Sequence, residues 1–257
     1  MERNHPDIKF NQRVLHFILP AYNEEASIQD LIERIAFVCN KNDYRYDILV
    51  IDDGSQDRTS EITEKLSKSL PVTTLKNSPN KGLGFTIRRG LKYATEHARK
   101  NDFIITLDSD LTQDPIYVKD MITQSLNGAD VVIASRYRRG SGTEGLAYYR
   151  HMLSIGASLF MFTLCPIKGV RDYSCGFRMY KPEILEWGFN QYGEEFVSES
   201  GFACMVEIAA RLNGKATFSE IPFVLKYDEK RKPSEMKILK TIKAYIRVMK
   251  KVKSPTT

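Results

Sequence analysis

The chain of 257 residues has little of what zinc-binding, disulfide-linked or membrane-spanning proteins require. Its four cysteines show no Cys-x-x-Cys spacing and its four histidines are scattered, so we expect neither a zinc site nor a disulfide framework. The longest uncharged apolar stretch, about 152–167, contains Pro166 and is shorter than the roughly 20 residues of a spanning helix. The N-terminus lacks the apolar core of a signal peptide. We therefore expect a cytoplasmic protein with reduced thiols and no transmembrane helix.

The composition is that of a globular chain with a moderate excess of positive charge. Hydrophobic residues make up 42% of the chain and charged residues 27%. This composition is enough to bury a full core and is not that of a disordered chain. The formal net charge of +6 fits anionic substrates or an anionic membrane surface. The basic residues cluster at the C-terminus and no nucleic-acid-binding motif is recognised, so we expect no nucleic acid partner.

Strand-like and helix-like segments alternate along the first half of the chain, which predicts an α/β fold with a mostly parallel central sheet and helices on both faces. After Ser135 this rhythm gives way to a polar loop. The expected strands are Val14–Leu19, Asp47–Ile51, Val72–Leu75, Phe103–Leu107, Ala129–Ala134, Cys175–Tyr180 and a β segment within Ala216–Leu225. The expected helices are Glu25–Cys39, Asp57–Lys68, Gly82–His97, Pro115–Leu126, Met152–Leu164, Ser200–Leu212 and a basic helix from about Ser234, with Arg136–Arg150 as the loop.

Two acids separated by one residue follow the apolar run Phe103–Leu107. Side chains at i and i+2 of an extended segment point the same way, so Asp108 and Asp110 can converge on one hard cation. The carboxyl ends of the strands are where open α/β sheets bind ligands. A divalent ion held by one or two carboxylates keeps positions for phosphate oxygens, which predicts Mg²⁺ or Mn²⁺ and a nucleoside diphosphate. The alternative is a pair of solvated loop acids or helix caps.

Polar segments also follow the first two expected strands. In Pro20–Glu24, Tyr22 can lie against a nucleobase and Glu24 can accept a hydrogen bond from it, or the segment can simply begin a helix. In the next segment, Asp53 stands where an acid commonly binds ribose hydroxyls, while Asp57 is a candidate helix cap.

A glycine-rich segment, Asn80–Gly90, follows the third expected strand. A dinucleotide fingerprint would need a third glycine where Ile87 stands, so a nicotinamide cofactor is disfavoured. Lys81 and Arg88 could instead face phosphates near the start of a helix.

Together these motifs resemble the family 2 glycosyltransferases of the GT-A fold, and most of all the polyprenyl-phosphate sugar transferases of the dolichol-phosphate mannosyltransferase type. The resemblance covers about residues 14–225. Its segments are Pro20–Glu24, Asp52–Asp57, Lys81–Arg88, Asp108–Asp110, Ala134–Tyr137, Ser174–Arg178 and Gly201–Phe202 followed by Glu207.

The resemblance implies a role for each matching residue. Asp110 would be the principal metal ligand, with Asp108 and Thr112 beside it, and Arg136 would contact the sugar or the phosphate. The residues implied to hold the nucleotide and its diphosphate are Pro20, Tyr22, Glu24, Ile51, Asp53, Asp108 and Ser109. A Ser-Lys pair that the family often has in a late basic segment is replaced here, with Glu235 in place of the lysine, so Lys230 or Arg231 could substitute.

The resemblance further implies an inverting transfer of a hexose from a GDP- or UDP-sugar to a polyprenyl phosphate. A lipid phosphate is already an anionic nucleophile, so no strong general base is needed. A saccharide or protein hydroxyl as acceptor would need one, and Asp172 and Glu207 are the candidates. Both could equally be structural, Asp172 paired with Arg171 or Arg178 and Glu207 a helix residue satisfied by a neighbouring donor. A third hypothesis is a nucleotide-sugar-binding protein without catalysis.

The last segment, Met236–Lys253, has apolar residues at helical spacing and seven basic residues. Such a helix either lies on an anionic membrane surface or docks on its own domain, and we expect the membrane contact for this segment. The apolar helix Met152–Leu164 has the same two alternatives. We expect one GT-A domain over residues 1–228, with a nucleotide-binding half at about 10–135 and an acceptor-side half at about 136–228, followed by the basic helix within 229–257.

Overall fold

The computed structural model describes residues 13–145, 148–231 and 238–253. In these residues the chain builds a seven-stranded sheet in the order β3-β2-β1-β4-β7-β5-β8 and a small two-stranded sheet of β6 and β9. The strands are β1 (Val14–Ala21), β2 (Arg45–Asp52), β3 (Val72–Lys76), β4 (Phe103–Thr106), β5 (Val131–Ser135), β6 (Gly142–Glu144), β7 (Arg178–Tyr180), β8 (Phe218–Pro222) and β9 (Val224–Lys226).

All strand pairs of the large sheet are parallel except those of β7, which runs antiparallel between β4 and β5. The helices are α1 (Ile28–Lys41), α2 (Thr59–Leu66), α3 (Leu83–His97), α4 (Val118–Leu126), α5 (Tyr148–Leu164), α6 (Pro182–Tyr192), α7 (Ala203–Leu212) and α8 (Ile238–Lys253). The expected α/β fold with a mostly parallel sheet is therefore confirmed.

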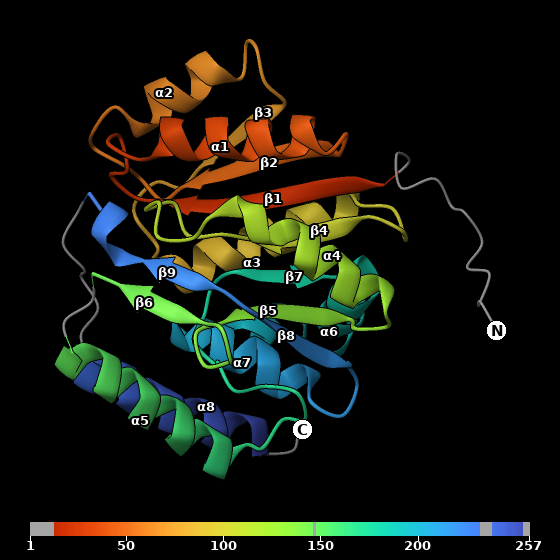
Figure 1. Ribbon diagram of the computed structural model, residues 1–257, viewed down its shortest axis with the longest axis vertical. Helices are drawn as coiled ribbons and strands as arrows, with labels where there is room; N and C mark the ends of the chain where they lie inside the picture. The colour runs from red at the N-terminus through yellow and green to blue at the C-terminus, as the bar shows by residue number, and fades with distance from the viewer. Residues whose placement is uncertain (1–12, 146–147, 232–237, 254–257) are drawn as a thin grey trace.

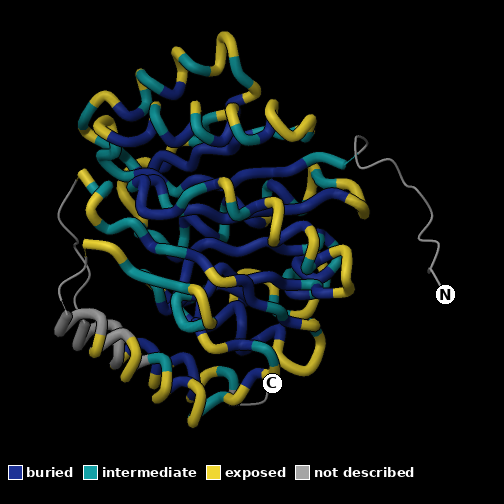
Figure 2. Tube along the Cα trace, viewed as in Figure 1, coloured by how far each residue is buried: buried dark blue, intermediate teal, exposed yellow. Residues whose placement is uncertain are grey.

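Helices cover both faces of the sheet (Figure 1). On one face α1 packs with α2, and α4 lies over β5 and β8, while α3, α6 and α7 pack together on the other face. Helix α8 packs against α7, and α5 lies beside α8 at the end of the molecule that carries β8 (Figure 1). The most deeply buried residues run along the central strands (Figure 2).

Several elements differ from the prediction, mostly after Ser135. Helix α6 was not predicted, although Pro182 at its first turn is a common start signal. The loop expected over Arg136–Arg150 contains β6, and α5 begins at Tyr148. The β segment expected in Ala216–Leu225 divides between two sheets as β8 and β9. The expected start of the basic helix at Ser234–Lys237 lies outside the described residues.

None of the described helices is both long and apolar enough to span a bilayer. The longest, α5, has 17 residues and still exposes large apolar side chains to solvent.

A buried histidine lies between two aspartates at the amino ends of the central strands. His16 on β1 is 8% exposed. Its Nδ1 lies 2.8 Å from Asp47 Oδ2, and its Nε2 lies 3.3 Å from Asp102 Oδ2. Burial, the largest single influence, lowers the pKa of His16, but hydrogen bonds and charge attraction from Asp47 and Asp102 outweigh it and raise the pKa above its ordinary value of 6.5. The protonated imidazole thus stabilises the fold.

We expect this histidine to make stability pH-dependent. A group whose pKa is raised by folding contributes fully below its unfolded pKa and loses that contribution as pH rises through the folded pKa. The free energy of unfolding should therefore fall as pH rises through the region above 6.5, and His16→Gln should lack this part of the decrease. Urea denaturation across this pH range measures the difference. His97→Gln is the control, because the exposed His97 hydrogen bonds a backbone carbonyl, that of Tyr93, rather than a carboxylate; parallel wild-type and His16→Gln profiles would contradict the assignment.

Candidate active site

The segment after β4 places its two aspartates in different but adjacent environments. Asp108 Oδ2 accepts a hydrogen bond of 2.6 Å from Gln113 Nε2, and the Asp108 amide donates to Gln113 Oε1. Asp110 Oδ1 accepts from the Thr112 hydroxyl at 2.6 Å. Burial, and then the charge of Asp110, raise the pKa of Asp108 to about 7. The two carboxylates therefore repel one another, and a cation between them would relieve this repulsion.

The backbone shapes this segment closely. Leu111 has φ of 67°, a left-handed conformation that costs a non-glycine residue of order 1 kcal/mol. Its apolar side chain is buried, which holds the turn after Asp110 in place. Across the site, a Cβ on Gly176 would lie 2.6 Å from Asp108 Oδ1, so this position requires glycine. The motif that contains Gly176 thus makes room for the carboxylate.

A lysine occupies the place where a cation would meet Asp110. Lys230 Nζ contacts Asp110 Oδ2, and both side chains are largely shielded from solvent. The described residues contain no group of three or more histidines, cysteines and acids that could surround a metal without help. Asp108 and Asp110 fit a hard divalent ion that completes its coordination with ligand oxygens and water, and the Lys230 ammonium stands in for that positive charge.

We predict that Lys230 competes with a divalent cation for Asp110. Lys230→Ala should strengthen Mn²⁺ binding about fivefold without nucleotide, because a shielded ion pair of this kind is worth about 1 kcal/mol. Electron paramagnetic resonance of free Mn²⁺ measures this affinity directly. The control is Arg231→Ala, since Arg231 pairs with Asp30 on α1 rather than with the aspartates. Unchanged or weaker Mn²⁺ binding in Lys230→Ala would contradict the competition.

The ends of β1 and β2 meet this segment. The Ser109 hydroxyl donates to the Pro20 carbonyl at 2.8 Å, so it joins the segment after β4 to β1, a structural role beside the expected contact with the diphosphate. Asp53 accepts from Asn77 Nδ2 and from the amides of Lys81 and Gly82, at 2.7–2.9 Å. Asp53 therefore holds the loop before α3, a structural role beside the expected contact with ribose. Ile51 is fully buried in β2.

The segment between β1 and α1 is held by hydrogen bonds within itself and to the turn before α2. Asn23, with φ of 54°, accepts from the Gln56 amide, and Glu24 accepts from the Ser27 hydroxyl. Tyr22 is half-buried. Asp57 accepts from the amides of Thr59 and Glu25, so it binds the first amide of α2 from one residue before the N-cap, which is Arg58 rather than the expected Asp57. The structure thus brings Tyr22 and Glu24 to the same edge of the sheet as Asp53.

Arg136 and Asp172 form a buried, bidentate ion pair beside the aspartates. Arg136 Nε and Nη2 each lie 2.7 Å from a carboxylate oxygen of Asp172. Burial, the largest influence, would raise the pKa of Asp172, but the charge and hydrogen bonds of Arg136 outweigh it and lower the pKa. Of the two alternatives for Asp172, the structure favours an ion pair over a free base, but the partner is Arg136 rather than the expected Arg171 or Arg178.

Polar contacts extend from this pair toward the last helix. Arg136 Nη2 also donates to Ser174 Oγ at 2.9 Å, and Ser174 lies close enough to Tyr245 of α8 to influence the pKa of its phenol. Burial raises the pKa of Tyr245 to about 12, so the phenol stays neutral. The sequence analysis did not identify Tyr245 or Gln113 as part of the site. Tyr245 lay in an apolar helical stripe that gave no indication of its polar partner.

Both carboxylate oxygens of Glu207 also have hydrogen-bond partners. It is fully buried and accepts from the amides of Ser198 and Glu199 and from the Ser198 hydroxyl, at 2.7–2.8 Å. Its remaining contact is an ion pair with Arg211, one turn along α7. These partners are structural, so the geometry favours that alternative for Glu207 as well.

Three basic residues proposed for phosphate contacts lie elsewhere or have other partners. Arg231 pairs with Asp30 and also donates to the Ala26 carbonyl, which turns it away from the aspartates and corrects its proposed role. Arg88 pairs with Glu194 and joins α3 to the 3₁₀ helix η3 (Gly193–Val197). Lys81 is exposed, with its ammonium 4.6 Å from the ring centroid of Phe85. Of the basic segment, Lys232–Glu235 lies outside the described residues.

A doubly wound sheet with paired aspartates at the carboxyl end of a central strand is the architecture of a GT-A glycosyltransferase. The solved structures agree on the fold: glucosyl-3-phosphoglycerate synthase from Mycobacterium tuberculosis, in complex with Mn²⁺, UDP-glucose and phosphoglyceric acid, superposes with a TM-score of 0.67. It shares 17% identity, over 93% of this chain and 79% of the other.

The sequence comparisons identify the family. Residues 16–189 match the family model "Glycosyl transferase family 2", and the chain belongs to that family. The motifs predicted this family. It is 32% identical to the dolichol-phosphate mannosyltransferase of Pyrococcus furiosus, over 80% of this chain and 54% of that protein. It is 26% identical to the polyprenol monophosphomannose synthase of Mycolicibacterium smegmatis, over 84% of this chain and 78% of that protein. The chain thus spans about half the length of the first relative.

Proposed function

We propose that this protein transfers a hexose from a nucleoside diphosphate sugar to a polyprenyl phosphate, with inversion at the anomeric carbon. The observation that carries the proposal is the cluster of Asp108, Asp110 and Lys230 at the carboxyl end of β4, next to the Arg136–Asp172 pair. The names of the two relatives above favour mannose as the sugar and a polyprenyl lipid as the acceptor. The donor nucleotide is GDP or UDP.

The cluster suits the leaving group of such a transfer. Asp108 and Asp110 would hold Mg²⁺ or Mn²⁺, which when bound supplies positive charge to the diphosphate oxygens. Lys230, displaced from Asp110, would remain close enough to neutralise charge that develops on the same diphosphate. Tyr22 and Asp53, at the same edge of the sheet, would contact the base and the ribose.

The state of the carboxylates supports a phosphate as the acceptor. Asp172 and Glu207 are the two acids considered as bases for a hydroxyl acceptor, and both are buried in ion pairs with arginines. A phosphate acceptor does not need a base to remove a proton. The ion pairs of Asp172 and Glu207 are therefore compatible with transfer to a phosphate. Arg136, which is partly exposed, would contact the incoming phosphate or the sugar.

We also propose contact with an anionic membrane surface, on the cytoplasmic side, but through a different helix from the one expected. Of the apolar residues of α8 whose burial the structure describes, Ala244, Tyr245, Val248 and Met249 are buried against the domain, Val252 is half-buried and Ile246 is exposed. Arg247 and Lys251 of α8 pair with the buried Glu199. Helix α8 is therefore docked, and the membrane contact expected of its apolar face moves to α5. Apolar side chains exposed on α5 are Met152, Ile155, Leu159, Phe160 and Phe162.

The transfer reaction tests the proposal. Purified protein is incubated with Mn²⁺, labelled GDP-mannose or UDP-glucose, and either short-chain polyprenyl phosphate or an oligosaccharide. We expect label in the lipid phosphate fraction only. Label confined to the oligosaccharide would overturn the acceptor, and donor binding without any transfer would favour a binding protein.

A further inference from the structure

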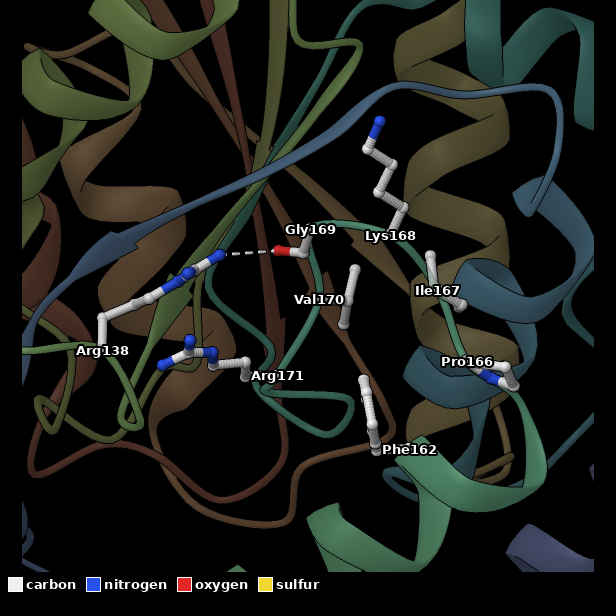
Figure 3. A pocket seen from close by; sticks show the side chains of 8 residues that line it. All are labelled: Arg138, Phe162, Pro166, Ile167, Lys168, Gly169, Val170 and Arg171. Carbon is white, nitrogen blue, oxygen red and sulfur yellow. Dashed lines mark hydrogen bonds between the residues drawn. The ribbon is translucent and has the colours of Figure 1, made fainter.

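A concavity lies between the end of α5 and the loop that leads toward β7. Its volume is about 510 Å³ and it is open to solvent on one side. Figure 3 shows the side chains that line it, from α5, from the loop of residues 166–171 and from the segment after β5. The lining residues are Arg138, Phe162, Pro166, Ile167, Lys168, Gly169, Val170 and Arg171.

The lining carries an excess of positive charge. Arg138 donates to the Gly169 carbonyl and pairs with Glu220, so its charge is compensated. Lys168 and Arg171 are exposed, and neither side chain has an acidic partner among the residues that the structure describes. Glu220 is already bound by Arg138 and by the Arg171 and Asp172 amides. The lining therefore carries two uncompensated cations, Arg171 on the side of Arg138 and Lys168 pointing away from them (Figure 3), and an excess of positive charge that suits an anion at Arg171.

The remaining lining is apolar and continuous with the exposed side of α5. Ile167 and Val170 are each 2% exposed and form a buried part of the lining. Phe162 lines the pocket and is at the same time one of the apolar side chains that α5 exposes, at 49%. A ligand with an anionic group next to an apolar body matches this combination. A free inorganic anion would leave the apolar lining unused.

The pocket is separate from the site that holds the aspartates. Arg136 binds the carboxylate of Asp172, whereas the Asp172 and Arg171 amides bind Glu220. Asp172 and Glu220 thus stand between Arg136 and the pocket cation Arg138. An anion in the pocket would not reach the cluster at Asp110 by the contacts seen here, so it would not be the reacting acceptor.

We propose that this pocket binds the phosphate-bearing headgroup of an anionic membrane lipid, while the exposed apolar residues of α5 enter the bilayer beside it. The inference rests on the membrane contact proposed above. It adds a specific lipid site that would hold α5 at the membrane independently of the acceptor. Arg171, on the same side of the lining as Arg138, would bind the phosphate, Lys168 would contact neighbouring headgroups, and Phe162 would contact the first carbons of the acyl chains.

Vesicle co-sedimentation of the full chain tests the site. Wild-type protein is compared with Lys168→Gln/Arg171→Gln on vesicles of phosphatidylcholine with or without phosphatidylglycerol. A basic residue near an anionic surface contributes about fivefold in binding, so the double variant should lose about twentyfold on phosphatidylglycerol vesicles. Lys100→Gln/Lys119→Gln removes the same charge from exposed positions on other elements and should change binding by less than about twofold.

Four outcomes have distinct meanings. Retained transfer to detergent-dispersed polyprenyl phosphate in the pocket variant would show an intact fold and, with the vesicle result, support the proposal. Equal vesicle binding by the pocket variant and the control variant would overturn the lipid site but leave the membrane contact standing. No binding of wild-type protein to either vesicle would overturn both. Thermal stabilisation of wild-type protein, but not of the pocket variant, by inorganic phosphate at constant ionic strength, with unchanged vesicle binding, would assign the pocket to a free phosphate and overturn the lipid.

Discussion

Asp110→Asn should lower kcat by at least about a thousandfold while the protein stays folded. The substitution keeps an oxygen that can accept from the Thr112 hydroxyl, so the turn is preserved. It removes the charge that Lys230 now neutralises and that a divalent cation would bind. Loss of one electrostatic group that acts on a developing charge costs about 100- to 1,000-fold, and loss of the cation adds to this. Steady-state kinetics at saturating donor, Mn²⁺ and acceptor measure kcat, and thermal melting measures the fold.

The control is Asp114→Asn, an acid of the same segment with a different task. Asp114 caps the turn that begins at Pro115 and pairs with Lys226, away from the aspartate pair. The Asp114→Asn variant should have a kcat within a few-fold of the wild-type value. If Asp110→Asn retained the wild-type rate, or if the wild type worked fully with excess chelator, the catalytic role given to the pair would be contradicted.

Glu207→Ala should lower the free energy of unfolding by roughly 3–5 kcal/mol. Removal of one partner from a buried ion pair leaves the other charge uncompensated, and here Arg211 is 6% exposed. The Ser198 and Glu199 amides would also lose their acceptor. Urea denaturation measures the loss. Because the residue is structural in this account, kcat measured well below the unfolding transition should stay within a few-fold of the wild type.

The isosteric variant Glu207→Gln separates stability from catalysis. Its amide oxygen can still accept from the backbone, so it should lose less stability than the alanine variant. A general base would contribute about 100- to 10,000-fold to the rate. A Glu207→Gln protein with near-normal stability and a rate lowered by that factor would contradict the structural role and would reopen a hydroxyl acceptor.

The sheet could be predicted from the sequence because its strands are short apolar runs followed by polar turns. The run Phe103–Leu107 and the acids after it predicted the strand, its direction and the edge of the sheet where a ligand binds. The elements after Ser135 were harder to predict. Strand β7 is three residues long and antiparallel, and β6 pairs with β9 across more than 80 residues of sequence, so no local periodicity marks either of them.

Side-chain partners were the least predictable part of the site. Arg231 and Lys230 are adjacent in a basic segment, yet one reaches Asp30 on α1 and the other Asp110. The apolar stripe of α8 was equally compatible with a bilayer and with α7, and the choice depended on Glu199, whose place beside Arg247 is set by tertiary structure. The division of the domain into a nucleotide-binding half and an acceptor half stays a prediction.

Donor binding with and without a divalent cation tests the central claim most directly. Isothermal titration calorimetry of GDP-mannose and UDP-glucose is carried out on the wild type and Asp110→Asn, each with Mn²⁺ and with chelator. The account predicts that at least one donor binds the wild type much more tightly with Mn²⁺, and that Asp110→Asn loses this gain. Equal affinity in all four conditions would mean that the aspartates neither hold a cation nor reach a diphosphate through it.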